Sequence, residues 1–554
     1  MSTGFAQLNG DLNDGFVGFP ADRAAMYRQA GYWTGASLDS ILSNGAAQWP
    51  DATAVVDSRR NYTFAELDAV ADRVAARLTA LGLSNGDRIL LQLPNTTGFA
   101  VAFFGLLRAG VVPVMCLSGH RSAELSHFAA VSGAVGLVIT DTAASFDFRE
   151  MAAQLQREHP ALHHVIVDGD PGRYIPWSTL TDPDGAPTTA APIREGFDPA
   201  APALMLVSGG TTGLPKLIAR THDDYVYTAV ASAQEYLMTN ADTYLVALPA
   251  GHNFPLGCPG MLGAMTVGAP TVFTTDPSPE HAFALIDKHN VTMTGLVNAL
   301  AKVWSQACDW EPVLPTSLRV VQVGGSRMTA EEAQFILDNL TPGLSQIFGM
   351  AEGMLNFTRP GDPVEVLLHT QGRPMSPLDE MLVVDEHGDA VAPGVEGELL
   401  VRGPNTINGY YRAEDANARS FSPEGYYRCG DRVRVFTDGP LAGYVEVTGR
   451  IKDVIHRGGE TVSASDLEEH LLAHPDIYAA AAVAMPDEYL GEKICAAVVF
   501  SGKPLTLGEL SSFLDRRGVS AHTRPDMLAA LPSLPKTAVG KVDKKQIIAQ
   551  LRSA

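Results

Sequence analysis

The chain has 554 residues, of which 46% are hydrophobic and only 18% are charged, which excludes a disordered or low-complexity protein and suits an enzyme of several packed domains. Its 62 acidic and 40 basic residues give a formal net charge of −22, which disfavours nucleic acid and anionic membrane surfaces as partners. The five cysteines are scattered without a C-x-x-C pair, so we expect neither a disulfide framework nor a zinc site.

No segment of the sequence predicts export or insertion into a membrane. The N-terminus lacks a basic stretch followed by an apolar one, so we expect no signal peptide. The longest apolar stretch, 99–117, contains Arg108 and Pro113, and is typical of a buried helix followed by a buried strand. We therefore expect a cytoplasmic protein.

The first half of the chain alternates predicted helices and strands. Thr63 and Glu66 form a capping pair at the start of a helix with one apolar face, and a second helix is predicted over 98–107. Apolar runs predict five strands, at 87–93, 111–117, 135–140, 163–168 and 203–207. This alternation is typical of a parallel sheet with helices on both faces. A stretch rich in Pro, Ala, Thr and Gly, 181–203, predicts a long surface connection.

The last hundred residues follow a different pattern. Two capping pairs predict short helices and two apolar runs predict strands: Ser463 with Asp466, Thr506 with Glu509, 479–485 and 494–500. This mixture is typical of a small α+β unit. We place the domain boundary near 449–452, which gives a core of residues 1–449 and a second domain of residues 450–554. The second domain has 13 basic and 13 acidic residues, so the core carries the whole net charge.

A glycine- and hydroxyl-rich loop, SGGTTGLPK at 208–216, directly follows the last of these strands. Its glycines let backbone N–H groups approach an anion, its hydroxyls add donors and its lysine adds a positive charge. The residues predicted to bind phosphate are Ser208, Gly209, Gly210, Thr211, Thr212, Gly213 and Lys216. The loop is not a Walker A motif, because two residues separate its last glycine from the lysine. Its composition alone would also suit a surface turn.

Several later segments give this loop its context. In chain order they are FGMAEG at 348–353, GELLVRG at 397–403, YYRCGD at 426–431, GRIKDVIHRGGETV at 449–462 and PKTAVGKVDK at 535–544. Together with the loop they resemble the core motifs of the adenylate-forming superfamily of acyl-CoA synthetases, nonribosomal adenylation domains and luciferases. Three further segments resemble the stand-alone aryl-acid AMP ligases that start aryl-capped siderophores: ARTHDDYVY at 219–227, GHNFPLGCPG at 251–260 and TQGRPMSP at 370–377.

This resemblance implies a fold and a set of nucleotide contacts. The implied fold is α/β: a large N-terminal domain of parallel α/β sheets with a β-rich subdomain, and a small mobile α+β C-terminal domain. Glu352 is implied as the ligand of Mg²⁺, which prefers carboxylate and phosphate oxygens. Asp431, assisted by Arg450, is implied to bind the ribose hydroxyls, and Phe348 to stack on the adenine. The other implied ATP contacts are Gly325, Gly349, Met350 and Ala351.

The resemblance also assigns catalytic residues. Lys541 would be delivered by the small domain onto the substrate carboxylate and the bridging phosphate oxygen, although its sequence context alone would equally suit a solvated basic tail. His252 and Glu352 complete the expected catalytic set. Lys452 is implied as the hinge between the domains, where an exposed charged residue tolerates backbone rotation.

The second half-reaction is expected to use another part of the small domain. Gly458 and Gly459, in HRGGE, would leave room for a phosphopantetheine arm. No carrier domain is recognisable after Lys541, so we expect the acceptor, a phosphopantetheinylated aryl carrier protein, to act in trans.

The acid is predicted from the segment 252–258, where similar enzymes build the aryl pocket. Asn253 can hydrogen-bond an ortho hydroxyl. Cys258 stands where 2,3-dihydroxybenzoate enzymes place a serine, and a weak thiol donor would leave the 3-hydroxyl of a catechol unpaired, at a cost of about 1–3 kcal/mol. Ile347 is larger than the valine of those enzymes. The implied aryl-binding residues are Asn253, Phe254, Cys258, Gly324, Ile347 and Lys541. We therefore predict that the protein activates salicylate with ATP and Mg²⁺.

Three alternatives remain open at this stage. The first alternative is that the acid is 2,3-dihydroxybenzoate, and the second is that the acceptor is free CoA. The third is that the protein binds nucleotides without catalysis. The last is disfavoured because the implied charged site residues are retained together: Lys216, Glu352, Asp431, Arg450 and Lys541.

Overall fold

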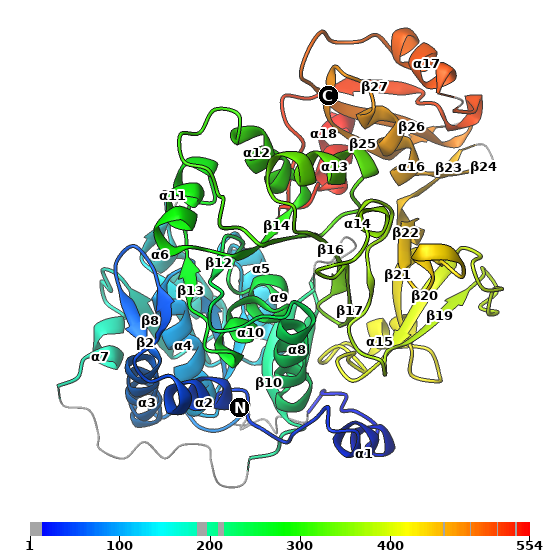
Figure 1. The fold of residues 1–554 in the computed structure, drawn as a ribbon. Coiled ribbons are helices and arrows are strands. Elements are labelled where there is room, and N and C mark those ends of the chain that lie inside the picture. The colour runs from blue at the N-terminus through cyan, green and yellow to red at the C-terminus, as the bar shows by residue number, and fades with distance from the viewer. Residues whose placement is uncertain are drawn as a thin grey trace, which may run out of the picture.

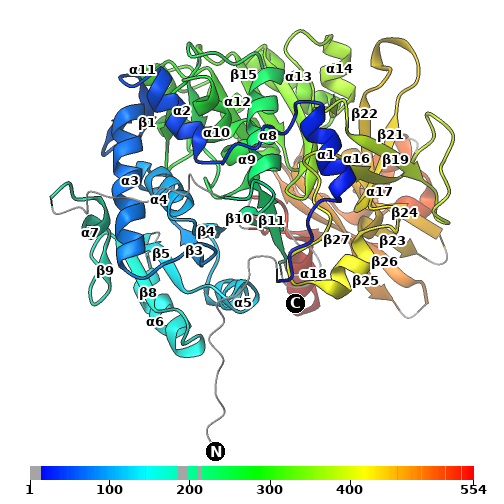
Figure 2. The ribbon, with the colours of Figure 1, turned by 90° about the horizontal axis from the view of Figure 1, so that it is seen from below.

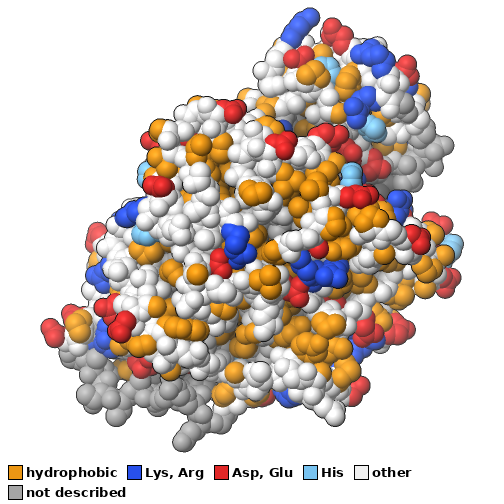
Figure 3. All heavy atoms as spheres, viewed as in Figure 1, with side chains coloured by type: hydrophobic (Ala, Val, Ile, Leu, Met, Phe, Trp, Pro, Cys, Tyr) orange, Lys and Arg blue, Asp and Glu red, His pale blue; other side chains and the backbone are white. Residues whose placement is uncertain are grey.

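The computed structural model describes residues 14–143, 145–184, 197–208, 215–457, 460–487, 489–517, 519–537 and 540–553. Figure 1 shows the large N-terminal part, coloured blue to yellow, with the C-terminal part in orange and red at one corner of it. Figure 2 gives the view from below, and in Figure 1 the C-terminal end lies at the top while the first helices, in dark blue, lie at the bottom. On the face drawn in Figure 3, acidic and basic side chains are interspersed among hydrophobic ones.

A seven-stranded sheet has the order β11-β10-β4-β3-β5-β8-β9. Its strands are β3 (Arg88–Gln92), β4 (Val112–Met115), β5 (Gly136–Thr140), β8 (His164–Asp168), β9 (Ile175–Pro176), β10 (Pro202–Val207) and β11 (Leu217–Thr221). All five predicted strands are confirmed. The sheet is parallel except between β10 and β11, which pair antiparallel.

Both helices predicted in this half of the chain are confirmed, and the structure adds further helices and a small hairpin. Thr63 and Glu66 make both hydrogen bonds of a capping box at the start of α3, as predicted. The elements are α1 (Ala21–Gln29), α2 (Ser40–Gln48), α3 (Phe64–Ala80), α4 (Thr97–Arg108), α5 (Ser122–Ser132), β6 (Thr142–Ala143), β7 (Phe146–Asp147), α6 (Phe148–Glu158) and α7 (Trp177–Thr181). The buried Arg108 of α4 is paired with Asp72, which explains a charge inside the apolar stretch. Of the helices described, none has the length and apolar character needed to cross a membrane.

A nine-stranded sheet, in the order β18-β17-β16-β15-β14-β12-β13-β1-β2, forms the second layer of the core. Its strands are β1 (Thr53–Val56), β2 (Asn61–Thr63), β12 (Tyr244–Val246), β13 (Thr271–Phe273), β14 (Met293–Val297), β15 (Val320–Gly324), β16 (Leu344–Met350), β17 (Gly353–Phe357) and β18 (Arg373–Pro374). In the middle of the sheet the neighbouring strands are all parallel, in the order β16, β15, β14, β12, β13 and β1. The carboxyl ends of β14, β15 and β16 therefore meet at one edge, which is where α/β sheets bind ligands.

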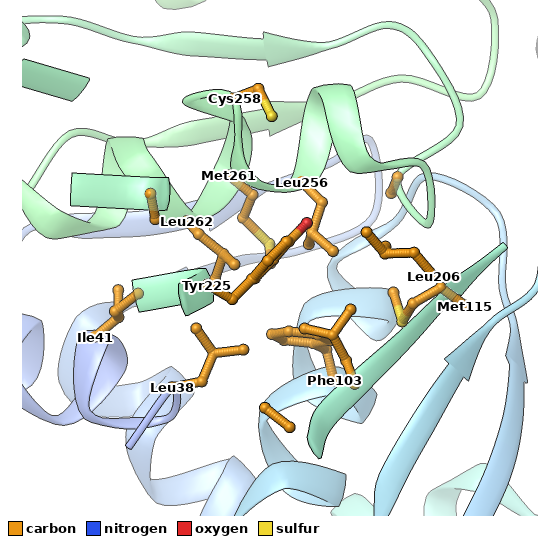
Figure 4. Close-up of a cluster of buried hydrophobic side chains, with 14 of the residues drawn as sticks. Leu38, Ile41, Phe103, Met115, Leu206, Tyr225, Leu256, Cys258, Met261 and Leu262 are labelled. Carbon is orange, nitrogen blue, oxygen red and sulfur yellow. The ribbon is translucent and has the colours of Figure 1, made fainter. Parts of the chain in front are cut away.

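The helices around this sheet are α8 (His222–Glu235), α9 (Asn253–Gly257), α10 (Gly260–Thr266), α11 (Pro279–His289), α12 (Asn298–Ala307), α13 (Ala330–Asn339) and α14 (Val364–His369). A continuous hydrophobic core joins α2, α3, α4, α8 and α10 between the two large sheets, and part of it is drawn in Figure 4.

Two smaller sheets complete the chain. The first is antiparallel and contains β19 (Glu380–Val384), β20 (Gly397–Arg402), β21 (Tyr427–Val435) and β22 (Val445–Arg450), with α15 (Glu414–Ser420) and the short helix η1 (Gly439–Leu441). The second contains β23 (Val454–Arg457), β24 (Glu460–Ser463), β25 (Ile477–Asp487), β26 (Gly491–Phe500) and β27 (Met527–Ala530), with α16 (Ala464–Leu472), α17 (Leu507–Arg516), η3 (Ala521–Thr523) and α18 (Lys544–Ser553). Both predicted capping residues, Ser463 and Thr506, begin helices.

The boundary predicted near 449–452 falls between these two sheets, at the end of β22 and in the short helix η2 (Ile451–Asp453). The C-terminal sheet has hydrophobic clusters of its own. The division into residues 1–449 and 450–554 stays a prediction.

Polar contacts join the C-terminal part to the core. Arg327, after β15, lies 3.3 Å from Glu469 on α16, and the ammonium of Lys302 on α12 lies 5.2 Å from the ring centre of Tyr478 on β25. These contacts hold the C-terminal part over the carboxyl ends of β14 and β15 (Figure 1).

Candidate active site

The segment predicted to form the aryl pocket folds as the short helix α9. His252 caps this helix, because its Nδ1 accepts the backbone N–H of Phe254 at 3.2 Å. Burial, followed by the positive charge of Lys541, lowers the pKa of His252 to about 4. The imidazole is therefore neutral at physiological pH, and its proton is on Nε2 because Nδ1 is an acceptor.

Asn253 and Cys258 lie at the two ends of α9 and contact each other. The amide Nδ2 of Asn253 donates to the Cys258 sulfur at 3.4 Å, while the hydroxyl of Tyr225 donates to Asn253 Oδ1 at 2.8 Å. Gln322 Nε2 donates to the Cys258 carbonyl oxygen at 3.0 Å. Burial raises the pKa of Cys258 to about 12, so its thiol is neutral.

The remaining predicted aryl contacts come from the ends of the parallel strands. A Cβ at Gly295 in β14 would lie 3.0 Å from the Phe254 ring, and one at Gly324 would lie 3.0 Å from the Ile347 carbonyl oxygen. The close approach of β14 to the Phe254 ring, and that of β15 to β16 at Ile347, are therefore possible because Gly295 and Gly324 carry no side chain. The sequence prediction did not include Gly295 or Tyr225. Tyr225 lies within a segment that the family resemblance had marked, which was the available signal.

The base of the phosphate loop is closed by two hydrogen bonds. Ser208 N–H donates to the Lys216 carbonyl at 2.9 Å, and Lys216 N–H donates to Ser208 Oγ at 2.9 Å. The Lys216 ammonium lies 5.3 Å from the ring centre of Tyr410. The other predicted loop residues, Gly209, Gly210, Thr211, Thr212 and Gly213, lie outside the described residues.

Glu352 lies in the tight turn between β16 and β17, and its side chain is held by a tyrosine. It is 8% exposed, and its Oε1 accepts the hydroxyl of Tyr410 at 2.8 Å. The Tyr427 hydroxyl lies 2.9 Å from that of Tyr410. Arg220 donates to the Ala351 carbonyl at 2.9 Å, which holds the turn from its other side.

The predicted adenine contacts line the strand leading into this turn. Phe348 and Met350 are half-buried and Gly349 is exposed. The Phe348 carbonyl accepts a hydrogen bond from Asn356 of β17 at 3.1 Å. The aromatic face of Phe348 is thus presented by a strand whose backbone is fixed.

Asp431 and Arg450 are directly opposite each other on β21 and β22. Arg450 Nε donates to Asp431 Oδ1 at 3.0 Å. Burial raises the pKa of Asp431, and the guanidinium opposes that shift. The positive charge of Lys541 also acts on the pKa of Asp431, opposing its rise.

Lys541 comes from the C-terminal part and reaches the core. Its Cε lies 3.2 Å from the position that a Cβ would take at Gly325, directly after β15. Gly325 has φ +98°, a conformation that also favours glycine. Burial, followed by Arg450, lowers the pKa of Lys541 to about 8, while Asp431 and Glu352 oppose this shift. Lys541 thus shares one electrostatic environment with the predicted ribose, metal and aryl residues.

The predicted hinge and thiol-channel residues are only partly described. Lys452 lies in η2, and the strands β23 and β24 flank Gly458 and Gly459, which are outside the described residues.

The donor set fits a magnesium nucleotide. In the described part of the chain, no group of three or more His, Cys, Asp or Glu side chains is arranged to hold a metal. Glu352 and Asp431 both act on the pKa of Lys541, and Tyr410 contacts both Glu352 and Lys216. Asp431 is already paired with Arg450, which leaves Glu352 as the carboxylate for a metal. One carboxylate suits Mg²⁺ that takes its other ligands from phosphate and water.

Comparisons with known proteins identify the family of the chain. The family model of AMP-binding enzymes matches residues 42–411, and the model of their C-terminal domain matches residues 466–541. The chain is 61% identical to a salicyl-AMP ligase / salicyl-S-ArCP synthetase of Mycobacterium tuberculosis, covering 97% of this chain and 94% of that protein. It is 42% identical to a 2,3-dihydroxybenzoate-AMP ligase of Bacillus subtilis, covering 96% and 97%.

A solved structure is also similar to this chain in sequence and fold. The apo structure of MbtA from Mycobacterium smegmatis is 62% identical, covers 97% of this chain and 99% of that chain, and superposes with a TM-score of 0.77. The chain belongs to the AMP-binding enzyme family.

Proposed function

We propose that the protein activates salicylate as salicyl-AMP with ATP, and then transfers the salicyl group to the phosphopantetheine thiol of an aryl carrier protein. The 61% identity to a salicyl-AMP ligase / salicyl-S-ArCP synthetase supports this proposal. The observation that carries it is the pair of Asn253 and Cys258. A buried neutral thiol that already accepts an N–H from Asn253 suits an aryl ring without a 3-hydroxyl better than a catechol.

In the first half-reaction, the salicylate carboxylate attacks the α-phosphorus of ATP. A P–O bond to the carboxylate forms, and the bond between the α-phosphorus and the bridging oxygen breaks, so that pyrophosphate leaves. Lys541 and Lys216 offset the negative charge that accumulates around the phosphates. Mg²⁺ held by Glu352 would supply further neutralisation when bound. His252, being neutral, leaves Lys541 as the positive charge beside the aryl carboxylate.

The nucleotide residues orient the reactants for this attack. Asp431 accepts hydrogen bonds from the ribose hydroxyls, with Arg450 holding the carboxylate in place. Phe348 stacks on the adenine, and the backbone of residues 349–351 and Gly325 pack around it. Ser208 and the loop that follows it bind the phosphates.

The second half-reaction needs the C-terminal domain in another orientation. We assign Lys452 as the hinge, and Gly458 and Gly459 as the residues that admit the pantetheine arm. The thiol sulfur forms a bond to the acyl carbon, the bond from this carbon to the AMP oxygen breaks, and the thiol proton is released. We assign the reaction to the cytoplasm, where all five cysteines remain as thiols, as they are in the structure.

ATP–pyrophosphate exchange measured with salicylate, 2,3-dihydroxybenzoate and benzoate tests the proposal. We expect the highest kcat/KM with salicylate. An equal or higher value with 2,3-dihydroxybenzoate would contradict the assignment of the acid. Supplying either free CoA or a purified phosphopantetheinylated carrier tests the acceptor, and faster thioester formation with CoA would contradict the assignment of the carrier.

A further inference from the structure

A buried tyrosine outside the predicted site holds the aryl-recognition amide. Tyr225 is the fourth residue of α8, whose start is set by a capping box between Thr221 and Asp224. Its side chain is completely buried, and Figure 4 shows its ring among Leu256, Met261 and Leu262. This packing allows the hydroxyl very little freedom of position.

Two neighbours restrict Tyr225 further. A Cβ at Gly257 would lie 3.1 Å from the tyrosine hydroxyl oxygen, so the hydroxyl fits against α9 only because that position is a glycine. On the other side, the Arg220 guanidinium lies 5.0 Å from the ring centre of Tyr225. Arg220 is itself held by hydrogen bonds to Asp224 at 3.1 Å and to the Asn405 carbonyl at 3.0 Å.

The direction of the hydrogen bonds gives the tyrosine a role. Its hydroxyl donates to Oδ1 of Asn253 at 2.8 Å, and Nδ2 of the same amide donates to Cys258 at 3.4 Å. Burial raises the pKa of Tyr225 well above its usual value, so the hydroxyl remains a donor. Because this bond holds Oδ1 toward Tyr225 and Cys258 takes one N–H of Nδ2, the second N–H of the Asn253 amide is the donor left for a substrate.

An N–H donor discriminates between ortho substituents. The phenolic hydrogen of salicylate can bond to its own carboxylate, which leaves a lone pair of the phenolic oxygen free to accept from Asn253. An ortho amino group, as in anthranilate, presents N–H bonds, and its lone pair is delocalised into the ring. If the Asn253 N–H faces an amino N–H, neither donor has an acceptor, which is unfavourable in a buried site.

We infer that Tyr225 is a positioning residue that fixes the Asn253 amide with its N–H toward the aryl acid, and thereby makes the pocket select acids with an ortho hydrogen-bond acceptor over those with an ortho donor. The inference rests on the proposed function, because it requires the aryl acid to lie against Asn253.

The first test is Tyr225→Phe, which keeps the ring and removes the hydroxyl. We expect kcat/KM in ATP–pyrophosphate exchange to fall about tenfold for salicylate and to rise for anthranilate. The Asn253 amide can then rotate and present its oxygen to the ortho amino group. Benzoate has no ortho group, so its kcat/KM should change less than about twofold. The matched control is Tyr227→Phe on the same helix, whose hydroxyl bonds to Ser376 instead and which should keep the wild-type salicylate/anthranilate ratio.

Two results with Tyr225→Phe would overturn the inference. One is an unchanged salicylate/anthranilate ratio with benzoate activity retained. The other is an equal loss for all three acids, which would mean that Tyr225 serves only the packing of the core.

The wild-type protein provides a second test that does not depend on a variant folding. 2-Fluorobenzoate carries an ortho acceptor and no donor, so we expect it to exceed benzoate in kcat/KM, and anthranilate to fall below benzoate. Anthranilate at or above the level of 2-fluorobenzoate would overturn the inference. A wild-type protein that does not prefer salicylate to benzoate would instead contradict the proposed function, so the two failures are distinguishable.

Discussion

The aryl half and the nucleotide half of the site are built in different ways. The aryl half is centred on one short segment, 252–258, which is held by hydrogen bonds between uncharged groups within the core. The nucleotide half brings charged residues together from distant parts of the chain, and one of them, Lys541, comes from the C-terminal part. The comparison indicates that acid selection is completed inside the core, whereas activation depends on how the C-terminal part is placed. The predictions below test this separation.

Lys541→Ala should have the largest effect. We expect adenylation in ATP–pyrophosphate exchange to fall about a thousandfold, because a half-buried positive charge beside the reacting phosphate is lost. Thioester formation from supplied salicyl-AMP should persist, and so should the preference for salicylate in binding measurements. Loss of both half-reactions, or loss of acid preference, would contradict the separation of the two halves.

Glu352→Gln should reduce adenylation about a hundredfold and raise the Mg²⁺ concentration needed for half-maximal exchange, because a neutral amide is a poorer ligand for a hard cation. Salicylate binding measured by calorimetry should be unchanged. Glu365→Gln, at an exposed position on α14, is the matched control and should have wild-type activity. An unchanged Mg²⁺ requirement in Glu352→Gln would remove Glu352 from the proposed metal site.

The pKa of Lys541, lowered to about 8 chiefly by burial, predicts a pH dependence. The protonated form is the active one, so kcat/KM for ATP should fall about tenfold per pH unit above pH ~8 as this proton is lost from the free enzyme. In Lys541→Arg the side chain stays charged at these pH values, and the decline should disappear even if the rate is lower. A decline that persists in this variant would assign the titration to another group.

Cys258→Ser should change the choice of acid and leave the nucleotide half unaffected. We expect the kcat/KM ratio of 2,3-dihydroxybenzoate to salicylate to rise about tenfold, because a hydroxyl can pair with the 3-hydroxyl of the catechol. KM for ATP should stay within about twofold of the wild-type value. A large change in KM for ATP with no change in acid preference would reverse the roles given to the two halves.

Arg327→Ala should have the smallest effect. It removes the contact with Glu469 across the two parts of the chain, and exposed ion pairs of this kind are weak. We expect adenylation to slow about twofold to fivefold, with thioester formation from supplied salicyl-AMP unaffected. High salt should also slow adenylation by the wild-type protein, because it screens this ion pair, and it should slow the variant less. Equal slowing of both half-reactions would show that Arg327 supports the fold generally.

The elements and the family were accessible from the sequence because they depend on local pattern. The predicted strands and the capping boxes at Thr63 and Thr506 involve residues only a few positions apart, and the structure has them at the predicted places. The antiparallel return of β11 was not predicted, because the strand periodicity does not contain its direction. The resemblance selected Asp431, Arg450 and Lys541, and the structure brings them into one electrostatic environment.

The sequence by itself determined the class of the protein, its motifs and the residue types that stand in them. Only the tertiary structure decided which neighbours these residues have. Tyr410 bonds to Glu352, Tyr225 bonds to Asn253, and Gly325 leaves room for the side chain of Lys541. Each of these contacts joins positions far apart in the chain. Their hydrogen-bond directions and close approaches depend on how sheets and helices pack, and no local pattern in the sequence records that packing.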